Sequence, residues 1–329
     1  MGNSRRLQSA RFGAMVLVGA LALGLNPPSA VPPASAAASA PDPAASTVRI
    51  ATLNTAATSS TRAAFNDVKN LLAQGPDIVA LQEMSSGERR QRVRERLTDC
   101  GTCVWDGWFP RHVLPGGLPI LWRSDKFTFV GNDWFEVAPA TYVGDRGAGP
   151  STIRARYVTR LRLRDNATNR IIWVLNTHFV PTVEGPNGRR NGNVRRTRLY
   201  SQHMTGLLGL IDRIRTKEGG GLVFVAGDFN VNYRKDKVAQ DPIFPYSALA
   251  TRDLRSSYFK LGEPALGTHI LDNGFDKRVI DYVHYRPSRR AVAVGQTVLR
   301  GFNSDHRPMI ADFRIRSRGC WAGPGRPVC

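Results

Sequence analysis

The sequence lacks several features that would place it in common classes of protein. It has four cysteines, a single C-x-x-C pair and no histidine near that pair, which disfavours a zinc site. A G-x-x-x-x-G-K-S/T phosphate loop is absent, which disfavours phosphoryl transfer driven by a nucleotide.

Long apolar runs are also lacking near the amino terminus. The run Ala14–Leu25 holds about 12 residues, fewer than the roughly 20 that cross a bilayer. Three arginines precede it, and the small-x-small pattern Ala38-Ser39-Ala40 follows. This order is typical of a secretory signal peptide, so we expect residues 1–40 to be removed and the protein to be secreted without stable membrane insertion. Ser4-Arg5-Arg6 leaves the twin-arginine and general export routes open, and a retained amino-terminal anchor is the alternative.

Acidic residues are heavily outnumbered. The chain has 26 Asp and Glu against 46 Lys and Arg, and residues 1–40 contribute three arginines and no acid, which leaves a formal net charge of +17 beyond them. Such a charge favours a polyanionic partner, either nucleic acid or anionic lipid. A general use of arginine in place of lysine is the plainer explanation. Candidate contacts to substrate phosphate are Arg189, Arg190 and Arg195, which are close in sequence.

The four cysteines are an even number in a chain that we expect to be exported. Two local bridges, Cys100–Cys103 and Cys320–Cys329, are the preferred choice among three connectivities. A redox-active C-x-x-C is the alternative, but no strand-helix-strand context supports a thioredoxin-like site. Structural disulfides fit an oxidising compartment.

Apolar strands and amphipathic helices alternate along the chain. Strand Val48–Asn54, helix Ser59–Leu72 and strand Asp77–Glu83 form a crossover unit, and strands Tyr157–Leu163 and Ile171–Phe179 form a hairpin. Further strands are expected at Ile120–Arg123, Phe127–Val137, Leu222–Asn230, Val279–Tyr285, Ala291–Leu299 and Met309–Ile315. Helices are expected at Glu88–Leu97, at Asn193–Lys217 and within Pro242–Gly262. Loops are expected at Val104–Pro119 and at Gly144–Thr152, and we expect the second loop to be mobile.

Polar side chains stand at the ends of six of these strands. They are Asn54, Glu83, His178, Asp228 with Asn230, Asp281, and Asp305 with His306. Each alone is explained equally well by a turn, a helix cap or a surface charge. Burying all of them would cost about 1 to 3 kcal/mol each unless they satisfy one another or a metal. A shared site is therefore the simplest explanation.

The residue types indicate the chemistry of that site. Carboxylate and amide oxygens without cysteine suit a hard cation, Mg²⁺ or Mn²⁺, with Ca²⁺ as a further option. Histidines beside carboxylates supply a general base and a second hydrogen-bond donor near neutral pH. This equipment suits the stabilisation of charge on a phosphoryl oxygen while water attacks.

The ordered motifs resemble those of the endonuclease/exonuclease/phosphatase superfamily, which includes deoxyribonuclease I, AP endonucleases, inositol polyphosphate 5-phosphatases and neutral sphingomyelinases. They are L-N-T at 53–55, L-Q-E at 81–83, N-T-H at 176–178, G-D-F-N at 227–230, I-D-Y at 280–282 and S-D-H at 304–306. The likeness covers about residues 47–316. It implies an α/β fold, a four-layer α/β/β/α sandwich of two packed mixed β-sheets flanked by helices. A linker at 41–46 would precede this domain, and a tail at 317–329 would follow it.

The resemblance also implies a metal site. Glu83 would be the principal ligand, with Asn54 beside it, and Asp305 would line the metal side of the site. Some members of the superfamily use a second cation.

The same resemblance implies catalytic roles. His306 would be the general base that activates water, oriented by Asp281, whose charge would raise the pKa of the imidazole. Asp228 would position the attacking water, while Asn230 and His178 would contact the scissile phosphate.

The sequence is compatible with three functions. A secreted nuclease or phosphodiesterase, monomeric and acting on DNA or RNA, is favoured by the export signal and the basic charge. A phosphomonoesterase or a sphingomyelinase-like lipid phosphodiesterase would share the catalytic residues and differ in its loops. A non-catalytic nucleic-acid-binding relative is disfavoured because Glu83, Asp228 and His306 are all present. The N-T-H motif resembles the deoxyribonuclease and phosphatase branches more than the AP endonucleases.

Overall fold

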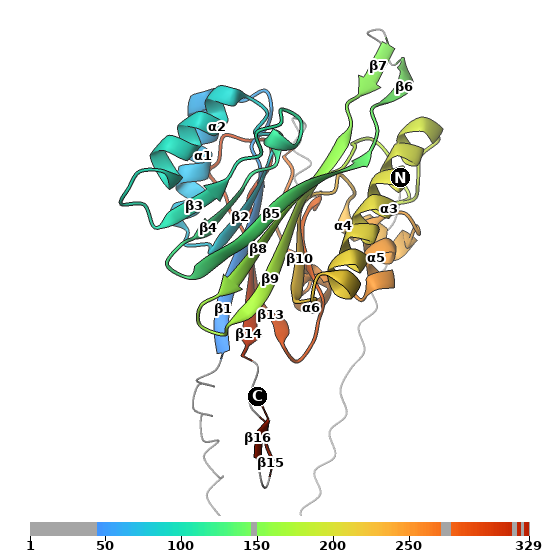
Figure 1. Cartoon of the computed structure of the whole chain (residues 1–329). Helices are drawn as coiled ribbons and strands as arrows, with labels where there is room; N and C mark the ends of the chain where they lie inside the picture. The colour runs from blue at the N-terminus through green and yellow to red at the C-terminus, as the bar shows by residue number, and fades with distance from the viewer. Residues whose placement is uncertain (1–44, 146–149, 271–277, 318–320, 324–325, 329) are drawn as a thin grey trace, which may run out of the picture. The chain divides into compact units, whose positions relative to one another are not determined.

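A computed structural model describes residues 45–145, 150–270, 278–317, 321–323 and 326–328. The expected signal peptide and the Cys320–Cys329 bridge lie outside the described residues. Two six-stranded mixed sheets form the centre, and helices cover their outer faces (Figure 1). The predicted four-layer α/β/β/α sandwich is confirmed.

The first sheet is built around a parallel pair, β1 and β2, which helix α1 (Thr61–Ala73) connects. Its strand order is β13 (Ala291–Val298), β14 (Met309–Arg316), β1 (Ala45–Asn54), β2 (Ile78–Gln82), β4 (Ile120–Arg123) and β3 (Trp105–Trp108). The other neighbours run antiparallel. Asn54 pairs with Gln82, so the carboxyl ends of β1 and β2 lie together.

The second sheet repeats this plan around the parallel pair β9 and β10, which helix α3 (Val194–Lys217) connects. Its strand order is β11 (Arg255–Ser256), β12 (Asp281–Tyr285), β10 (Leu222–Asp228), β9 (Arg170–His178), β8 (Arg156–Asp165) and β5 (Phe127–Ala138). The predicted hairpin is present as β8 and β9, which pair in antiparallel fashion.

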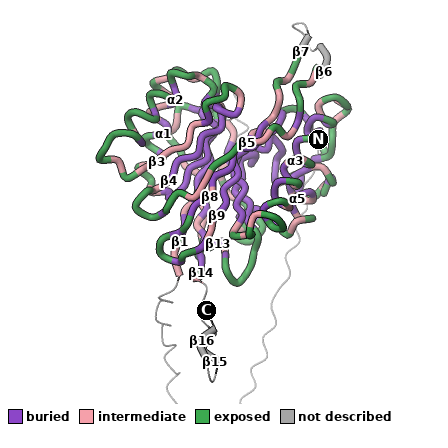
Figure 2. Tube along the Cα trace, viewed as in Figure 1, coloured by how far each residue is buried: buried purple, intermediate pink, exposed green. Residues whose placement is uncertain are grey.

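The central strands are buried on both faces, which is why their sequences read as continuous apolar runs. Val48 and Ile50 of β1 belong to the main core between the two sheets. Ala51 and Leu53, which lie in the second core cluster, pack with residues of α1. In Figure 2 the strands at the centre are accordingly coloured as buried, while exposed segments lie on the helices and loops.

Short helices complete the outer layers. The predicted helix Glu88–Leu97 is present as α2 (Gly87–Val93) followed by a π-helical turn at Arg94–Thr98. The remaining short helices are a 3₁₀ turn at Pro115–Gly117, α4 (Tyr233–Ala239), α5 (Pro245–Ala248), a 3₁₀ turn at Leu249–Arg252 and α6 (Ser257–Leu261). No helix among these described residues is long and apolar enough to span a membrane.

Three local predictions were wrong. The segment Val104–Pro119 was expected as a loop, but Trp105–Trp108 forms the edge strand β3 because it pairs with β4. The expected loop Gly144–Thr152 overlaps a hairpin of β6 (Thr141–Asp145) and β7 (Pro150–Ile153). The expected linker 41–46 overlaps β1, because Ala45 and Ser46 pair with the end of β14.

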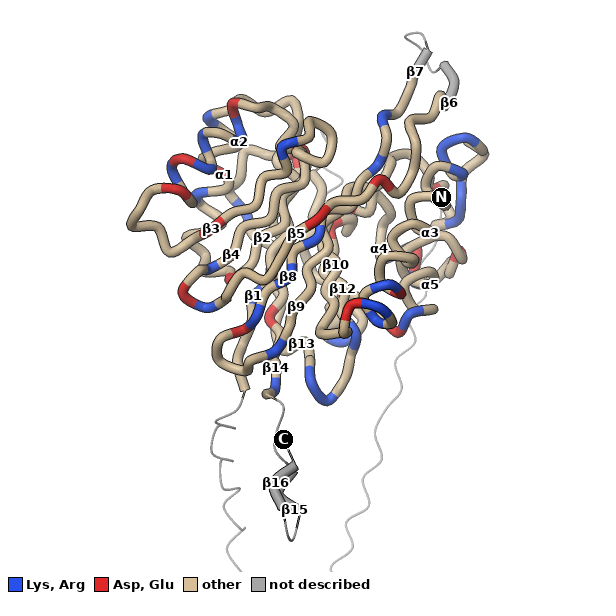
Figure 3. The backbone as a smooth tube through the Cα atoms, in the orientation of Figure 1, with Lys and Arg blue, Asp and Glu red and all other residues tan. Residues whose placement is uncertain are grey.

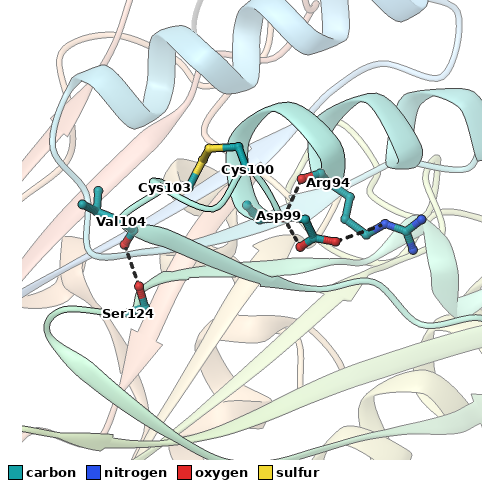
Figure 4. The surroundings of a disulfide bond; sticks show 7 residues. Arg94, Asp99, Cys100, Cys103, Val104 and Ser124 are labelled. Atoms are coloured by element: carbon teal, nitrogen blue, oxygen red, sulfur yellow. Dashed lines mark hydrogen bonds and ion pairs between the residues drawn. A yellow bond between two sulfur atoms is a disulfide. The ribbon is translucent and has the colours of Figure 1, made fainter.

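The predicted disulfide Cys100–Cys103 is present (Figure 4). It closes the turn between the π-helical segment and β3. Nearby, Asp99 forms an ion pair with Arg94, and the Ser124 hydroxyl donates to the carbonyl of Val104. The disulfide therefore constrains the turn that leads into β3, the edge strand of the first sheet.

Candidate active site

The polar strand ends meet at one edge of the sandwich. Parallel pairing places Asn54 beside the end of β2, and it places Asp228 beside His178. Asp281 opens β12, which is antiparallel to β10, so its start lies opposite Asp228. His306 precedes β14, which is antiparallel to β1. The carboxyl ends of the parallel strands β1, β2, β9 and β10 and the amino ends of the antiparallel strands β12 and β14 thus lie at the same edge.

Asp228 is the centre of the hydrogen-bond network at this edge. Its Oδ2 accepts from Nδ2 of Asn54 at 3.1 Å and from Nδ2 of Asn230 at 3.2 Å, and its Oδ1 accepts from the Asn230 amide at 2.8 Å. Asn230 adopts a left-handed backbone conformation with φ of 56°, and its Nδ2 also donates to the Phe179 carbonyl. Burial raises the pKa of Asp228, and the positive charge of His306 offsets only part of this rise.

His306 is held between two carboxylates. Its Nδ1 lies 2.9 Å from Oδ2 of Asp281, and its Nε2 lies 3.7 Å from Oδ2 of Asp228. Burial alone would lower the pKa of His306, but the charges of Asp281 and Asp228 outweigh it and raise the pKa to about 10. Without a bound ion the imidazole is therefore protonated at neutral pH.

His178 is the counterpart of His306 on the other side of Asp228. Its Nε2 lies 3.4 Å from Oδ2 of Asp228 and 3.8 Å from Oε1 of Glu83. Burial and the charge of Arg156 lower its pKa, although both carboxylates act in the opposite direction. The two histidines of the site are thus driven to different charge states, one neutral and one positive.

Glu83 lies just beyond β2 in a left-handed conformation with φ of 60°. Its carboxylate accepts from Nδ2 of Asn54 at 3.1 Å and from the backbone amide of Ala57. Burial raises the pKa of Glu83, but its electrostatic interaction with His178 and these hydrogen bonds reverse the shift, so the pKa is lowered overall. Arg89 of α2 binds the carbonyls of Ala56 and Ala57 and so fixes the loop that holds Glu83.

Helix α1 positions the segment that carries His306. The buried carboxylate of Asp67 accepts from the amides of Asn303 and Ser304 at 2.9 to 3.0 Å. The Ser304 hydroxyl donates to the carbonyl of Asn54 at 2.7 Å and accepts from the amide of His306. The loop before β14 is therefore tied both to an outer helix and to the end of β1.

A buried polar network joins the two sheets beneath the site. The Thr52 hydroxyl donates to Oε1 of Gln82, whose Nε2 donates to Oδ1 of Asn176 at 2.8 Å. Asn176 in turn donates to the carbonyls of Leu81 and Pro119. Since these bonds link β1, β2, β9 and the residue before β4, the network fixes the separation of Glu83 and His178.

Two groups of described residues carry possible ligand atoms within 4.8 Å of one another, namely His269, Asp305 and His306, and Asp228, Asp281 and His306. Their carboxylates, with no thiol among them, fit a hard divalent cation. The family resemblance assigns the ion to Glu83 and the exposed Asp305; Asp305 belongs to one of these groups and Glu83 to neither. Asn54 directs its amide nitrogen at Glu83 and Asp228, while its oxygen accepts from Ala56. Asn54 would become an oxygen ligand only with its amide turned over.

The three arginines that the sequence predicts as phosphate contacts lie before helix α3 and at its start. Arg190 forms an ion pair with Asp241 at 3.1 Å, Arg195 lies 5.0 Å above the ring of Tyr142, and Arg189 is exposed. None of these contacts reaches the carboxylates and histidines of the site, so the role of the three arginines as phosphate contacts stays a prediction. The segment carrying Arg189 and Arg190 is instead packed on α4.

Arg156 is the cation that sequence reasoning missed. Its guanidinium is half-buried and senses the charges of Asp228 and Glu83, which partly offset the burial that lowers its pKa to about 10. Arg156 opens β8, so a search of strand ends does not find it. The repeated basic residues R-A-R at 154–156 were the available signal.

His269 is a second missed residue. It forms a β-bridge with His306, and the centroids of the two rings are 4.7 Å apart. His269, Asp305 and His306 carry ligand atoms within 4.8 Å of one another. No apolar strand precedes His269, so the pattern that identified the other residues could not identify it.

The assembled groups can perform hydrolysis at phosphorus. His178 can donate a hydrogen bond to a phosphoryl oxygen, and Arg156 adds positive charge. The side-chain amide of Asn230 already donates to Asp228 and to the Phe179 carbonyl, so Asn230 would contact the phosphate only by giving up one of these partners. His306 can hold a proton at Nε2 while Asp281 stabilises its positive charge through Nδ1. A bound divalent cation would supply Lewis-acid stabilisation of a phosphoryl oxygen.

Comparisons with known proteins agree with this geometry. A structure of an endonuclease/exonuclease/phosphatase from Bacteroides vulgatus is similar over 82% of this chain and 100% of its own, with 18% identity and a TM-score of 0.56. The mannosyl-6-phosphatase of Bacteroides thetaiotaomicron (15% identity, 81% and 99% coverage) and D. rerio TDP2 complexed with single strand DNA product (13% identity, 82% and 99% coverage) also give TM-scores of 0.56. These likenesses show the fold.

No curated protein sequence matches the chain. The model of the Endonuclease/Exonuclease/phosphatase family, however, matches residues 51–306, which include every strand end of the site. The chain therefore belongs to the endonuclease/exonuclease/phosphatase family of phosphoester hydrolases.

Proposed function

We propose that the protein is a secreted, metal-dependent phosphodiesterase that cleaves the backbone of DNA or RNA. The observation that carries this proposal is His306, which Asp281 and Asp228 hold on one side of a site whose other side is formed by Glu83 and His178. In the proposed reaction water attacks phosphorus in line with the leaving oxygen. The water gives its proton towards Nε2 of His306 once that nitrogen is free.

The charge of the protein supports a nucleic-acid substrate. The formal net charge is +17 beyond residue 40, and Lys and Arg occur on many surface segments of both halves of the sandwich (Figure 3). A polyanion binds such a surface by releasing counterions, so its cleavage should weaken as salt rises. A small phosphomonoester would depend much less on salt.

A substrate panel tests the proposal. Purified protein with Mg²⁺ or Mn²⁺ would be assayed on plasmid DNA, RNA, sphingomyelin, inositol phosphates and a sugar phosphate. Cleavage of DNA or RNA that stops with EDTA and falls with salt is expected. Intact nucleic acid together with turnover of a lipid or a monoester would overturn the proposal in favour of those alternatives.

His306→Ala provides the matched control for that panel. It should reduce nucleic-acid cleavage by several orders of magnitude while the far-ultraviolet circular dichroism spectrum is unchanged. Residual cleavage in the variant at the wild-type rate would point to a contaminating nuclease.

Secretion is supported by the basic, apolar and small-residue order at residues 1–40. Expression of the full chain in a bacterial host should place a shortened protein outside the cytoplasm. Amino-terminal sequencing should find a start near residue 41. A full-length product in the membrane fraction would support a retained anchor.

A further inference from the structure

A cavity of about 200 Å³ opens beside the catalytic groups. Glu83 and His178 line one part of it, and Val113, Leu114 and Leu118 form an apolar part. Pockets for drug-sized ligands are larger, roughly 300 to 1,000 Å³. The cavity is therefore suited to one small ring system directly next to the reacting phosphate.

Two arginines, Arg154 and Arg156, also line this cavity. Within the described part of the chain, neither has a carboxylate within ion-pairing distance, and Nε of Arg156 is buried without a hydrogen-bond partner. Unpaired guanidinium groups favour anionic ligands and repel a cationic headgroup such as choline. The ligand of the cavity is thus expected to combine an apolar ring with negative charge.

Aromatic rings continue from the cavity to the surface. Tyr157 lines the cavity, and its ring centroid lies 5.6 Å from that of Trp134. Trp134 stacks on His112 with centroids 5.2 Å apart, and 37% of Trp134 remains exposed. Exposed aromatic faces bind nucleobases that are not stacked in a duplex. Because Val113 follows His112, the stacked pair and the cavity form one surface.

We propose that the cavity is a subsite for the base of one unpaired nucleotide beside the scissile phosphate, with the next base stacked on Trp134 and His112. This inference rests on the proposed nuclease function. Arg154 and Arg156 would bind the phosphates that flank this nucleotide. A polyol such as inositol fits less well, since in the part of the cavity formed by Val113, Leu114 and Leu118 its hydroxyls would lose water without gaining side-chain hydrogen bonds.

The expected consequence is a preference for single strands. A base in a duplex is paired and stacked, and it must leave the stack before it can enter the cavity, which costs binding energy. We therefore expect a single-stranded oligonucleotide to be cleaved at least about tenfold faster, as kcat/KM, than the same strand annealed to its complement.

The test uses the mature protein, a fluorescein-labelled oligonucleotide in DNA and RNA versions, and the corresponding duplexes. A third substrate carries baseless sugars on either side of one fixed phosphate. Faster cleavage of the single strand and slow cleavage at the baseless position are expected. Equal rates on all three substrates would overturn the inference.

Two variants test the residues themselves. Trp134→Ala should lower kcat/KM on the single strand about tenfold, because one stacking face is lost, and Val113→Glu should lower it by repelling phosphate. Phe129→Ala is the matched control, since Phe129 lies on the same strand, is 46% exposed and stacks on Trp122 instead. Binding of the single strand in EDTA, followed by fluorescence anisotropy, should weaken in parallel.

The outcomes separate this inference from the proposed function. If no nucleic acid is cleaved but another phosphoester is, the proposed function fails and the inference fails with it. If duplex and single strand are cleaved equally well and Trp134→Ala behaves like Phe129→Ala, the inference fails alone. The baseless substrate tests the base subsite with the wild-type protein, so this test does not depend on the folding of a variant.

Discussion

Nδ1 of His306 lies 2.9 Å from Oδ2 of Asp281, and both residues are buried. This pair fixes the orientation of the imidazole, so that Nε2 is directed towards Asp228. The carboxylate also supplies the charge that raises the pKa of His306. Orientation and charge can be separated by a substitution that keeps the shape of the side chain.

Asp281→Asn should remove the charge while retaining an amide of similar size. The pKa of His306, followed by NMR, should fall from about 10 because the largest stabilising charge is lost. Turnover should fall by about 10² to 10⁴, as when the orienting carboxylate of a catalytic histidine is replaced.

Asp165→Asn controls for the loss of a buried carboxylate elsewhere, since Asp165 accepts from Ser46 and Thr168 rather than from the site. It should leave the pKa of His306 unchanged. An unaltered pKa in Asp281→Asn would show that this carboxylate does not set the charge of the histidine.

Arg156→Gln should weaken substrate binding more than Arg190→Gln does. Arg156 lies in the field of Glu83 and Asp228, whereas Arg190 is engaged by Asp241. We expect KM for nucleic acid to rise about tenfold in Arg156→Gln, with the slope of log(kcat/KM) against log salt reduced by about one. Larger effects in Arg190→Gln would restore the assignment made from sequence.

The strand ends were predictable because each is marked by a polar residue after an apolar run. Asn54, Glu83, His178 and Asp228 follow this rule, and parallel pairing brings them to one edge. Arg156 does not follow it, because it stands at the start of a strand, where it pairs with Ala138 of β5, and no apolar run precedes it.

The loops were less predictable for a related reason. The sequence of edge strand β3 is W-D-G-W, in which apolar and polar residues do not alternate as they do in a half-buried strand. Only its pairing with β4 shows that it is a strand. Asp67 is similar, since an acid inside a helix gives no sign that it will bind the amides of Asn303 and Ser304. The contacts of Asp67 join residues more than two hundred positions apart in the chain.

A divalent cation should stabilise the folded protein. Asn54 Nδ2 lies 3.1 Å from an oxygen of Glu83 and 3.1 Å from an oxygen of Asp228, so two carboxylates flank it. A cation that binds only the folded state raises stability by about 2.7 kcal/mol at a hundredfold excess over its Kd. Addition of Mg²⁺ should therefore raise Tm, and EDTA should reverse the rise. Glu83→Gln should abolish most of it.

Glu88→Gln is the matched control for that measurement, since Glu88 is exposed on α2. It should keep the full rise in Tm. A rise that persists in Glu83→Gln would place the bound ion elsewhere.

Asp236→Asn should stabilise the protein above neutral pH. The Asp236 carboxyl is fully buried in α4, where its Oδ2 accepts from the amide of Tyr246 and its Oδ1 has no partner among the described residues. Burial, together with the charges of Glu184 and Asp241, raises its pKa from 3.8 to about 7. The folded state thus holds the proton more tightly than the unfolded state, so this group costs stability as pH rises from about 4 to about 7 and costs it fully above that range.

The full cost of this buried charge is at most about 4 kcal/mol, at about 1.4 kcal/mol for each pKa unit. The asparagine keeps an oxygen that accepts from the amide of Tyr246, but it places an NH₂ group at the position of Oδ1, where no partner is present among the described residues. This unpaired group offsets part of the benefit, so we expect the free energy of unfolding to rise by about 1 to 2 kcal/mol at pH 8. Urea unfolding of both proteins at pH 4, 6 and 8 measures it, with Asp212→Asn, a surface residue paired with Arg252, as the control. The gain should grow with pH because only the wild type loses a proton from this site. A difference that stays constant between pH 4 and pH 8 would show that Asp236 does not titrate in this range.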